Sequence, residues 1–285
     1  MTDNRLILDC QGLRALNPEL ITSSSLEVLS VRENQLTALP SALWNLTVLR
    51  SLSLGENNLS EIPEAIGKLT TLQQLYLDGN PLTTVPDSLG QLIHLHTLDL
   101  GHCRLERLPE SLATLRELKF FYASDNQLTE CPDWIGDLSS LTYFNMTDNK
   151  LKIVPESIGK LSNLVELRLY NNQLRALPAA VSQLSSLREL YLRGNQLEVL
   201  PDETGLLRDL RILDLRNNAL TRVPEGIGSL QNLLYLDLRG NQLKSVPEVI
   251  SGLSRLEKLD LRWNQIAGKS AWMQQMEARG CLVYV

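Results

Sequence analysis

The chain of 285 residues has few of the side chains that most often carry chemistry. It contains three histidines and four cysteines, and Cys10, Cys103, Cys131 and Cys281 form neither a CxxC pair nor a terminal cluster. Such spacing argues against a zinc ribbon and against a small disulfide-stapled domain, and it fits a reducing compartment. We therefore expect a cytoplasmic protein, with secretion as an effector into a host cell as the alternative.

Long apolar runs and an excess of positive charge are also missing. No segment reaches the roughly 18 apolar residues of a membrane-spanning helix, and the N-terminal residues lack the basic and apolar regions of a leader peptide. The 27 Lys and Arg are outnumbered by 33 Asp and Glu, which gives a net charge of −6. Because phosphate binding needs a basic face, we expect no nucleic-acid partner. The missing apolar run predicts no membrane span.

Motifs for catalysis and cofactor binding are absent from the sequence. It contains no GxGxxG after a strand, no GxxxxGK[ST], no HExxH and no GxSxG. His94, His96 and His102 are near one another, but their spacing matches no ordinary zinc pattern. Cys103 follows a histidine, yet Pro109 stands where a phosphatase-type HCx5R loop needs its arginine. We expect no enzyme, no catalytic residue, no metal and no cofactor.

What the chain does contain is a leucine register with a period of 23 residues. Leucine stands at the first position of eleven consecutive units, from Leu26 to Leu256, without an insertion or a deletion. In the unit that begins at Leu49, Leu52 and Leu54 alternate with small polar residues, which is typical of a strand buried on one face. Such a repeat predicts stacked supersecondary units in a solenoid, not a closed globule.

Two further positions of the repeat predict how each unit turns. The ninth position is Asn in ten of the eleven units, and Cys103 takes its place in the fourth. An amide that recurs once per turn can satisfy backbone groups of neighbouring turns, so burying it costs little. The fifteenth position is a proline such as Pro63, which cannot continue a strand and suits the start of a short helix or 3-10 segment.

These patterns predict an α/β fold, a right-handed solenoid shaped like a horseshoe, with a parallel β-sheet on its concave face and short helical or 3-10 segments on its convex face. We expect a single domain over residues 1–285, with a degenerate first repeat at 3–25, eleven 23-residue repeats at 26–278 and a C-terminal cap at 279–285. The first strand is expected to leave an open edge, unless charged residues such as Asp3, Arg5 and Asp9 discourage pairing there. A monomer is expected, and a dimer through that edge is the alternative.

Aromatic side chains concentrate at positions that should face outward. The third, fifth and seventh positions of each unit point away from the core, and the eighth lies at the rim. Exposed aromatics on a rigid surface often anchor protein interfaces, although tyrosine also favours strands for its own sake. The candidate aromatic residues at these three outward positions are Tyr76, Phe120, Tyr122, Tyr143, Tyr170, Tyr191 and Tyr235.

Arginine and aspartate form two neighbouring columns in the last units. Arginine recurs at the seventh position and aspartate at the fifth, so stacking in register places like charges about 4.8 Å apart. Either the two columns neutralise each other, or they form a polar platform for an acidic or mixed-charge loop of a partner. The charged candidates, with one rim aromatic, are Arg168, Arg193, Asp214, Arg216, Asp237, Arg239, Asp260, Arg262 and Trp263.

The pattern LxxLxLxxNxLxxLPxxIGxLxxL, nearly intact in residues 49–72 and 141–164, resembles the cytoplasmic leucine-rich-repeat class with 23-residue repeats. That class includes Ras-associated scaffolds, Scribble-type polarity proteins and bacterial repeat proteins. The resemblance covers essentially the whole chain and is specific for fold. It implies a protein partner, for which a small GTPase or another signalling protein is a candidate.

The sequence therefore predicts a non-enzymatic interaction module that binds a partner protein through its concave sheet. Two alternatives remain open at this point: a secreted bacterial effector that acts on host proteins, and a recognition subunit of a separate kinase or ubiquitin ligase.

Overall fold

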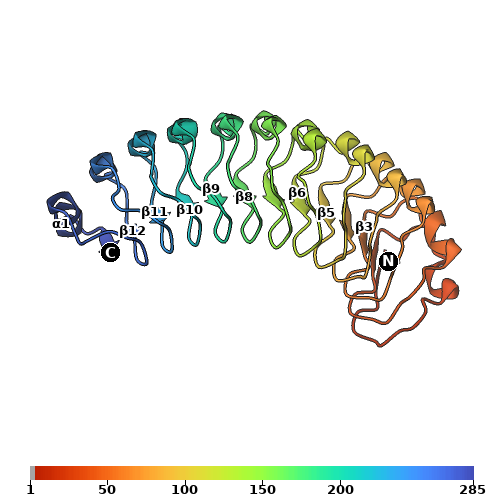
Figure 1. Cartoon of the computed structure of the whole chain (residues 1–285). Coiled ribbons are helices and arrows are strands. Elements are labelled where there is room, and N and C mark those ends of the chain that lie inside the picture. The colour runs from red at the N-terminus through yellow and green to blue at the C-terminus, as the bar shows by residue number, and fades with distance from the viewer. Residues whose placement is uncertain (1–3) are drawn as a thin grey trace. The chain divides into compact units, whose positions relative to one another are not determined.

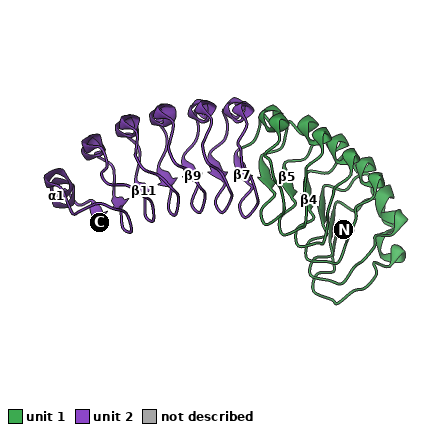
Figure 2. Cartoon of the chain, in the orientation of Figure 1, with its two compact units in different colours: residues 1–141 green, residues 142–285 purple. Residues whose placement is uncertain are grey.

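The computed structural model describes residues 4–285 (Figure 1). Asp3, which the sequence places at the start of the degenerate first repeat, lies outside the described residues. The chain divides into two compact units, unit 1 over residues 1–141 and unit 2 over residues 142–285 (Figure 2). The single domain expected over 1–285 stays a prediction.

Unit 1 alternates parallel strands with 3-10 segments. The strands are β1 (Arg5–Ile7), β2 (Val28–Ser30), β3 (Ser51–Ser53), β4 (Gln74–Tyr76), β5 (Thr97–Asp99) and β6 (Phe120–Tyr122). The 3-10 segments are η1 (Pro18–Ile21), η2 (Ser41–Asn45), η3 (Glu64–Lys68), η4 (Asp87–Gln91), η5 (Glu110–Thr114) and η6 (Asp133–Asp137). Each strand pairs with the next in sequence, and Leu29 lies opposite Leu52. The pairing offset is therefore the 23 residues of the leucine register.

Unit 2 continues the same alternation and ends in an α-helix and a strand. Its strands are β7 (Tyr143–Asn145), β8 (Glu166–Arg168), β9 (Glu189–Tyr191), β10 (Ile212–Asp214), β11 (Tyr235–Asp237), β12 (Lys258–Asp260) and β13 (Leu282–Tyr284). Its helical segments are η7 (Glu156–Lys160), η8 (Ala179–Gln183), η9 (Asp202–Leu206), η10 (Glu225–Ser229), η11 (Glu248–Gly252) and α1 (Ala271–Ala278). Neighbouring strands are again parallel, as at Leu213 opposite Leu236.

The strands and the 3-10 segments lie on opposite sides of each unit (Figure 2). The central residue of each repeat strand, such as Leu52 or Leu190, is buried, because the period of a strand sends it inward and its neighbours outward. In each unit, the strand side chains that point away from the core lie on the concave side, and we call this surface the inner face. The predicted alternation of strands and 3-10 segments is thus confirmed.

Proline sets the start of the 3-10 segments. Pro63 has a φ of −72°, close to the angle that its ring imposes, and η3 begins at the next residue. The segment ends where the N–H of Leu69 donates to the carbonyl of Ile66. Glycine is required at position 67, because a Cβ there would lie 2.8 Å from the Cβ of Ser88 in the next segment. Small residues therefore let successive 3-10 segments pack closely.

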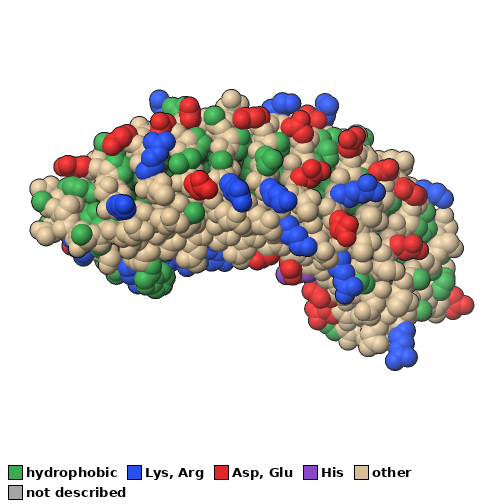
Figure 3. All heavy atoms as spheres, in the orientation of Figure 1, with side chains coloured by type: hydrophobic (Ala, Val, Ile, Leu, Met, Phe, Trp, Pro, Cys, Tyr) green, Lys and Arg blue, Asp and Glu red, His purple; other side chains and the backbone are tan. Residues whose placement is uncertain are grey.

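Acidic residues follow most of these prolines. The first turn carries Asp or Glu in η3 to η7 and in η9 to η11. Acidic side chains accordingly gather along the 3-10 side of the face seen in Figure 3. The inner face has a different charge pattern, which is described below.

The asparagine of each repeat joins neighbouring turns. Asn57 donates from Nδ2 to the carbonyls of Val31 and Leu54 at 2.9 and 3.0 Å, and its Oδ1 accepts from the N–H of Leu36 at 3.0 Å. The side chain is buried, so every polar atom it presents has a partner inside the protein. The predicted amide ladder is confirmed.

Cys103 replaces the ladder asparagine as a hydrogen-bond donor but not as an acceptor. Its Sγ lies 3.6 Å from the carbonyl of Leu77 and 3.4 Å from that of Gly101, so the thiol replaces the donor function of the amide. It supplies no amide oxygen, and the N–H of Leu82 instead donates to the carbonyl of Asn80 at 2.8 Å. Backbone rearrangement at Leu82 thus compensates for the missing acceptor.

The ends of the chain depart from the repeat in two ways. In the first copy the proline is displaced, and η1 begins at Pro18 itself, with Asn17 as a cap that accepts from the N–H of Glu19 at 3.0 Å. In the last copy Ser270 replaces the proline, and α1 buries Met273 and Met276. The expected final strand is β13, which pairs with β12.

The ladder generates the first prediction. Asn195 bonds the carbonyls of Leu169 and Leu192 and the N–H of Leu174, so Asn195→Ala leaves buried backbone groups unsatisfied. We expect the free energy of unfolding, measured by urea titration, to fall by roughly 2–4 kcal/mol. Cys103→Asn is the matched control, since it restores the missing acceptor and should raise that free energy by about 1 kcal/mol. A loss of stability in both variants would contradict the ladder.

Candidate functional site

The candidate residues all lie on strands of the inner face or directly after them. Tyr76, Phe120 and Tyr122 belong to unit 1, and the other candidates belong to unit 2. Phe120 and Tyr235 are exposed, at 41% and 40%, and the remaining candidate tyrosines are half-buried. The contiguous aromatic cluster expected from Phe120 to Tyr191 therefore divides between the units, and its continuity stays a prediction.

Unit 2 holds a stack of arginine and tyrosine at its first three strands. The guanidinium carbon of Arg168 lies 5.5 Å from the ring centre of Tyr143 and 5.1 Å from that of Tyr191. Arg168 also pairs with Glu166 on the same strand. The Tyr191 hydroxyl donates to Glu189 at 2.7 Å, and burial together with this bond raises the pKa of Tyr191. The two tyrosine rings and the charged groups of Arg168 and Glu166 are thus held in fixed positions. Such preorganisation is favourable for recognition.

A second arginine stacks one turn further on. The guanidinium carbon of Arg193 lies 4.3 Å from the ring centre of Tyr170, where an arginine is attracted by the negative face of the ring. Because stacking leaves the N–H groups at the guanidinium edge available, Arg193 can still donate hydrogen bonds to an incoming group.

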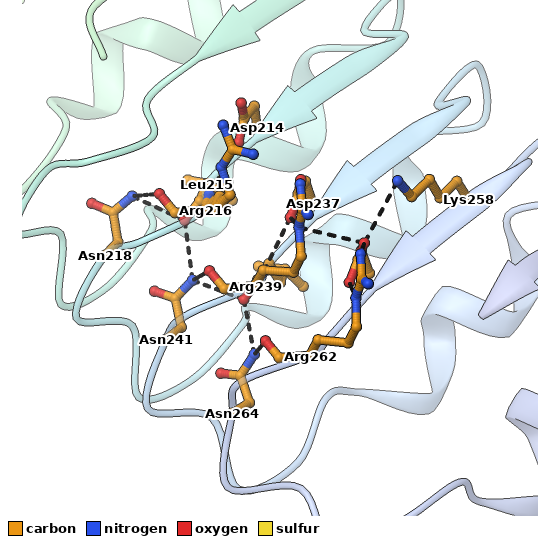
Figure 4. A network of polar contacts seen from close by, with 12 residues as sticks. Asp214, Leu215, Arg216, Asn218, Asp237, Arg239, Asn241, Lys258, Arg262 and Asn264 are labelled. Carbon is orange, nitrogen blue, oxygen red and sulfur yellow. Dashed lines mark hydrogen bonds and ion pairs between the residues drawn. The ribbon is translucent and has the colours of Figure 1, made fainter. Parts of the chain in front are cut away.

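The arginine and aspartate columns neutralise each other at β11 and β12 (Figure 4). Arg239 donates from Nε to Asp237 at 2.9 Å, and Arg262 donates from Nη2 to Asp260 at 2.7 Å. Asp260 has no exposed surface and also lies 3.5 Å from Nζ of Lys258. Burial alone would raise the pKa of Asp260, but the bond from Arg262 and the charge of Arg239 outweigh it and lower the pKa.

Asp214 is the exception in the aspartate column. Its Oδ1 accepts from the backbone N–H of Arg216 at 3.1 Å, and within residues 4–285 it pairs with no arginine or lysine side chain. Burial raises its pKa and the nearby charge of Asp237 adds to the rise, while the backbone bond from Arg216 and the charges of Arg216 and Arg193 oppose it. Direct ion pairs therefore neutralise the columns at β11 and β12, whereas Asp214 at β10 interacts with arginine charges only without a direct pair.

The C-terminal end of unit 2 carries an exposed aromatic corner. Trp263 is 70% exposed and has a φ of 60°, in the left-handed region that a bulky side chain rarely adopts. The guanidinium carbon of Arg262 lies 5.8 Å from its ring and 4.9 Å from the ring of Tyr284. Sequence patterns did not indicate Tyr284, because β13 belongs to no repeat; its only signal is an aromatic residue in the closing segment.

Unit 1 contains an ion pair that the sequence patterns also missed. Arg32 donates from Nη1 and Nη2 to the two carboxylate oxygens of Asp78 at 3.1 and 2.8 Å, although one whole turn lies between the two residues. The side chains cross Gly55, which occupies the same position in the intervening turn; a Cβ there would lie 2.5 Å from Oδ1 of Asp78. Opposite charges flanking a glycine at one repeat position are the sequence signal for such a bridge.

This bridge leads to a paired mutational test. We expect Gly55→Ala to displace the Asp78 carboxylate and to lower the free energy of unfolding by about 1–3 kcal/mol. Gly252→Ala is the control, because no atom lies within 4 Å of the added Cβ; its effect should stay within about 0.5 kcal/mol. Equal effects of the two substitutions in urea titrations would rule out the steric explanation.

Asp99 lies next to this pair on β5 without a cation of its own. Its Oδ1 accepts from the N–H of Gly101 at 2.9 Å. Burial raises the pKa of Asp99 to about 6 from an ordinary value of 3.8, and the charge of Asp78 adds to the rise. A carboxyl group whose pKa is higher in the folded state stabilises the fold when protonated, and it loses that contribution as the pH rises through the folded pKa.

Asp99 should therefore make stability depend on pH. Asp99→Asn keeps an oxygen acceptor for Gly101 and removes the charge, so we expect a higher melting temperature than wild type at about pH 7 and no difference at about pH 4. Glu61→Gln removes the same charge from an exposed site and corrects for the change in net charge. A melting-temperature difference for Asp99→Asn that is independent of pH would contradict the raised pKa.

Cys103 and two of the histidines, His94 and His96, are the residues that the sequence singles out as candidates for chemistry. Burial raises the pKa of Cys103 to about 11, which keeps it a thiol at neutral pH. Nδ1 of His94 and Nε2 of His96 lie 3.3 and 3.8 Å from one Glu117 oxygen on the surface. Within residues 4–285 no group of three or more His, Cys, Asp and Glu is arranged to hold a metal ion, and no helix there has the length and apolar character of a membrane span.

An open groove lies on unit 2 away from these residues. It has a volume of about 720 Å³ and is lined by residues 152–156, 173, 175–178 and 196. Its charged side chains are Lys152, Glu156 and Arg175, and its lining contains no histidine, cysteine or serine. The groove therefore brings together no nucleophile and base.

Comparison with known proteins places the repeat among characterised ones. Models described as leucine rich repeat match residues 4–59, 40–82, 70–128, 152–197 and 208–266, and a related one matches 140–161. A search of curated proteins gave no match.

Solved structures show the same architecture. A leucine-rich-repeat protein of Leptospira interrogans is 30% identical, covers 96% of this chain and 82% of its own, and gives a TM-score of 0.65. An internalin of Listeria monocytogenes, at 23% identity with 99% and 86% covered and a TM-score of 0.77, supports the fold alone. A chain in the crystal structure of PEPR1-AtPEP1 is 30% identical over 95% of this chain and 43% of its own length, with a TM-score of 0.76.

The family models cover most of the chain, and the Leptospira protein matches nearly its full length. Together with strands that pair at the period of the leucine register, these matches identify the fold as a leucine-rich-repeat solenoid. The chain belongs to the leucine-rich-repeat family.

Proposed function

We propose that the protein is a non-enzymatic scaffold that binds a partner protein with the inner face of unit 2. The proposal rests on one group of side chains in which each arginine stacks on a tyrosine ring, namely Tyr143, Arg168, Tyr170, Tyr191 and Arg193. Aromatic and arginine side chains provide most of the binding energy in many protein interfaces. Because these side chains are already held in place, little rotamer freedom is lost when a partner binds.

Membership of the family supports this proposal. Leucine-rich-repeat proteins and their structural neighbours are protein-interaction modules. A cytoplasmic location and a small GTPase as the partner stay predictions from the sequence.

The tyrosines provide the test. We expect the triple variant Tyr143→Ala, Tyr170→Ala, Tyr191→Ala to lose most capture of the partners that the immobilised wild-type chain retains from cell extract, as quantified by mass spectrometry. Loss of the stacking contacts should lower the melting temperature only slightly, since each is worth about 0.5–1 kcal/mol at an exposed site.

A second triple variant controls for the loss of apolar surface. Val199, Leu206 and Val249 are exposed residues of unit 2 that lie outside the strands, at 38%, 57% and 41%. Their replacement by alanine should leave capture unchanged. Undiminished capture by the tyrosine variant, or equal loss in both triples, would show that the inner face of unit 2 is not the binding surface.

A further inference from the structure

Four arginine side chains on two adjacent turns of unit 2 form no direct ion pair with a side chain of residues 4–285. Arg188 and Arg211 precede β9 and β10, and Arg193 and Arg216 follow them. Arg193 stacks on the Tyr170 ring. The charges of Arg193 and Arg216 also act on Asp214 without a direct ion pair and oppose the rise in the pKa of that carboxyl. Arg188 and Arg211 are exposed, and Arg193 and Arg216 are half-buried.

Strand pairing places these arginines side by side. Ile212 lies opposite Glu189, and the N–H of Arg211 donates to the carbonyl of Arg188 at 2.8 Å. Beyond the other end of the strands, the N–H of Gly194 donates to the carbonyl of Arg216 at 2.8 Å. Backbones of adjacent strands are about 4.8 Å apart, so each pair brings two like charges together. Such repulsion is unfavourable unless an anion lies between them.

The carboxylates on the same strands are already engaged. Glu189 accepts from the Tyr191 hydroxyl at 2.7 Å, and Asp214 accepts from the backbone N–H of Arg216. The arginines on the flanking strands are neutralised, as at Arg168 with Glu166 and at Arg239 with Asp237. Positive charge without an internal partner is thus confined to β9 and β10 among the strands of unit 2 described here.

We propose that these four arginines bind two carboxylates of an extended acidic segment of the partner protein. Arg193 and Arg216 take one carboxylate, and Arg188 and Arg211 take the other. On each of the two turns, the two arginines are five residues apart, which is roughly 16 Å along an extended backbone. A partner segment with acidic residues four positions apart, which lie on the same face of an extended strand, therefore fits both pairs. Guanidinium groups bind carboxylates with directed hydrogen bonds.

Charge elsewhere in the protein favours a short acidic protein segment over a nucleic acid. Unit 1 carries 9 Lys and Arg against 18 Asp and Glu, whereas unit 2 carries 18 against 15. A long polyanion needs a basic face along its whole length, which the first unit does not provide. This inference rests on the proposed binding function and specifies the chemistry of the partner.

The test uses the full chain and a fluorescent peptide with two glutamates four positions apart. We expect fluorescence anisotropy to show binding that weakens with salt, and no binding of the same peptide with glutamine in place of glutamate. Arg193→Ala/Arg216→Ala and Arg188→Ala/Arg211→Ala should each weaken binding at least tenfold. Circular dichroism should show that both double variants remain folded, because none of these side chains is in the core.

Arg208→Ala/Arg222→Ala is the matched control, since it removes the same charge from exposed positions of unit 2 that lie outside the strands. Its binding should stay within twofold of wild type. Equal weakening in the control, failure to prefer glutamate over glutamine, or equally tight binding of a single-stranded oligothymidine would overturn the proposal. Partner capture that is lost in the tyrosine triple variant but kept in both arginine variants would leave the proposed function standing and reject this inference alone.

Discussion

The amide of the repeat asparagine is the contact on which the rest of each unit depends. After every strand the chain bends sharply, and the backbone groups at the bend would be buried without partners. Asn57 and its equivalents satisfy carbonyls of two successive turns and one N–H, and where Cys103 replaces the amide the Leu82 N–H donates to the Asn80 carbonyl instead. Amides that must lie in register with their neighbours favour a constant period, which here is 23 residues.

Because the backbone is fixed in this way, the inner face has freedom only in its side chains, and charge is accommodated there in different ways. Arg239 pairs with an aspartate of its own strand, Arg193 stacks on a tyrosine, and Arg32 reaches across a glycine to the second turn along. Among the arginines beside β9 and β10, Arg193 has only its tyrosine ring, and Arg188, Arg211 and Arg216 form neither an ion pair nor a ring contact within residues 4–285. That difference distinguishes a lattice of charges that serves stability from a surface suited to recognition.

The fold could be predicted from the sequence almost element by element. Leucine spacing located the strands, and prolines such as Pro63 located the starts of the 3-10 segments, since both act through local backbone geometry. The site was predicted less completely. Repeat positions indicated which side chains face outward, but whether Arg168 meets a glutamate or a ring depends on rotamers and on neighbours in other turns. The contacts of Asp78 and Tyr284 needed coordinates, because one partner lies two turns away and the other lies outside the repeat.

Coupling between turns has a consequence for motion. Each repeat asparagine bonds only its own turn and adjacent ones, so unit 2 can fray stepwise from the end that carries α1 and β13 without breaking contacts deeper in the stack. β11 and β12 lie between that end and β10, so they open before β10 does. Openings that reach β9 and β10 are therefore expected to be rarer than those at β13, and the arginine pairs should keep their spacing while the end opens.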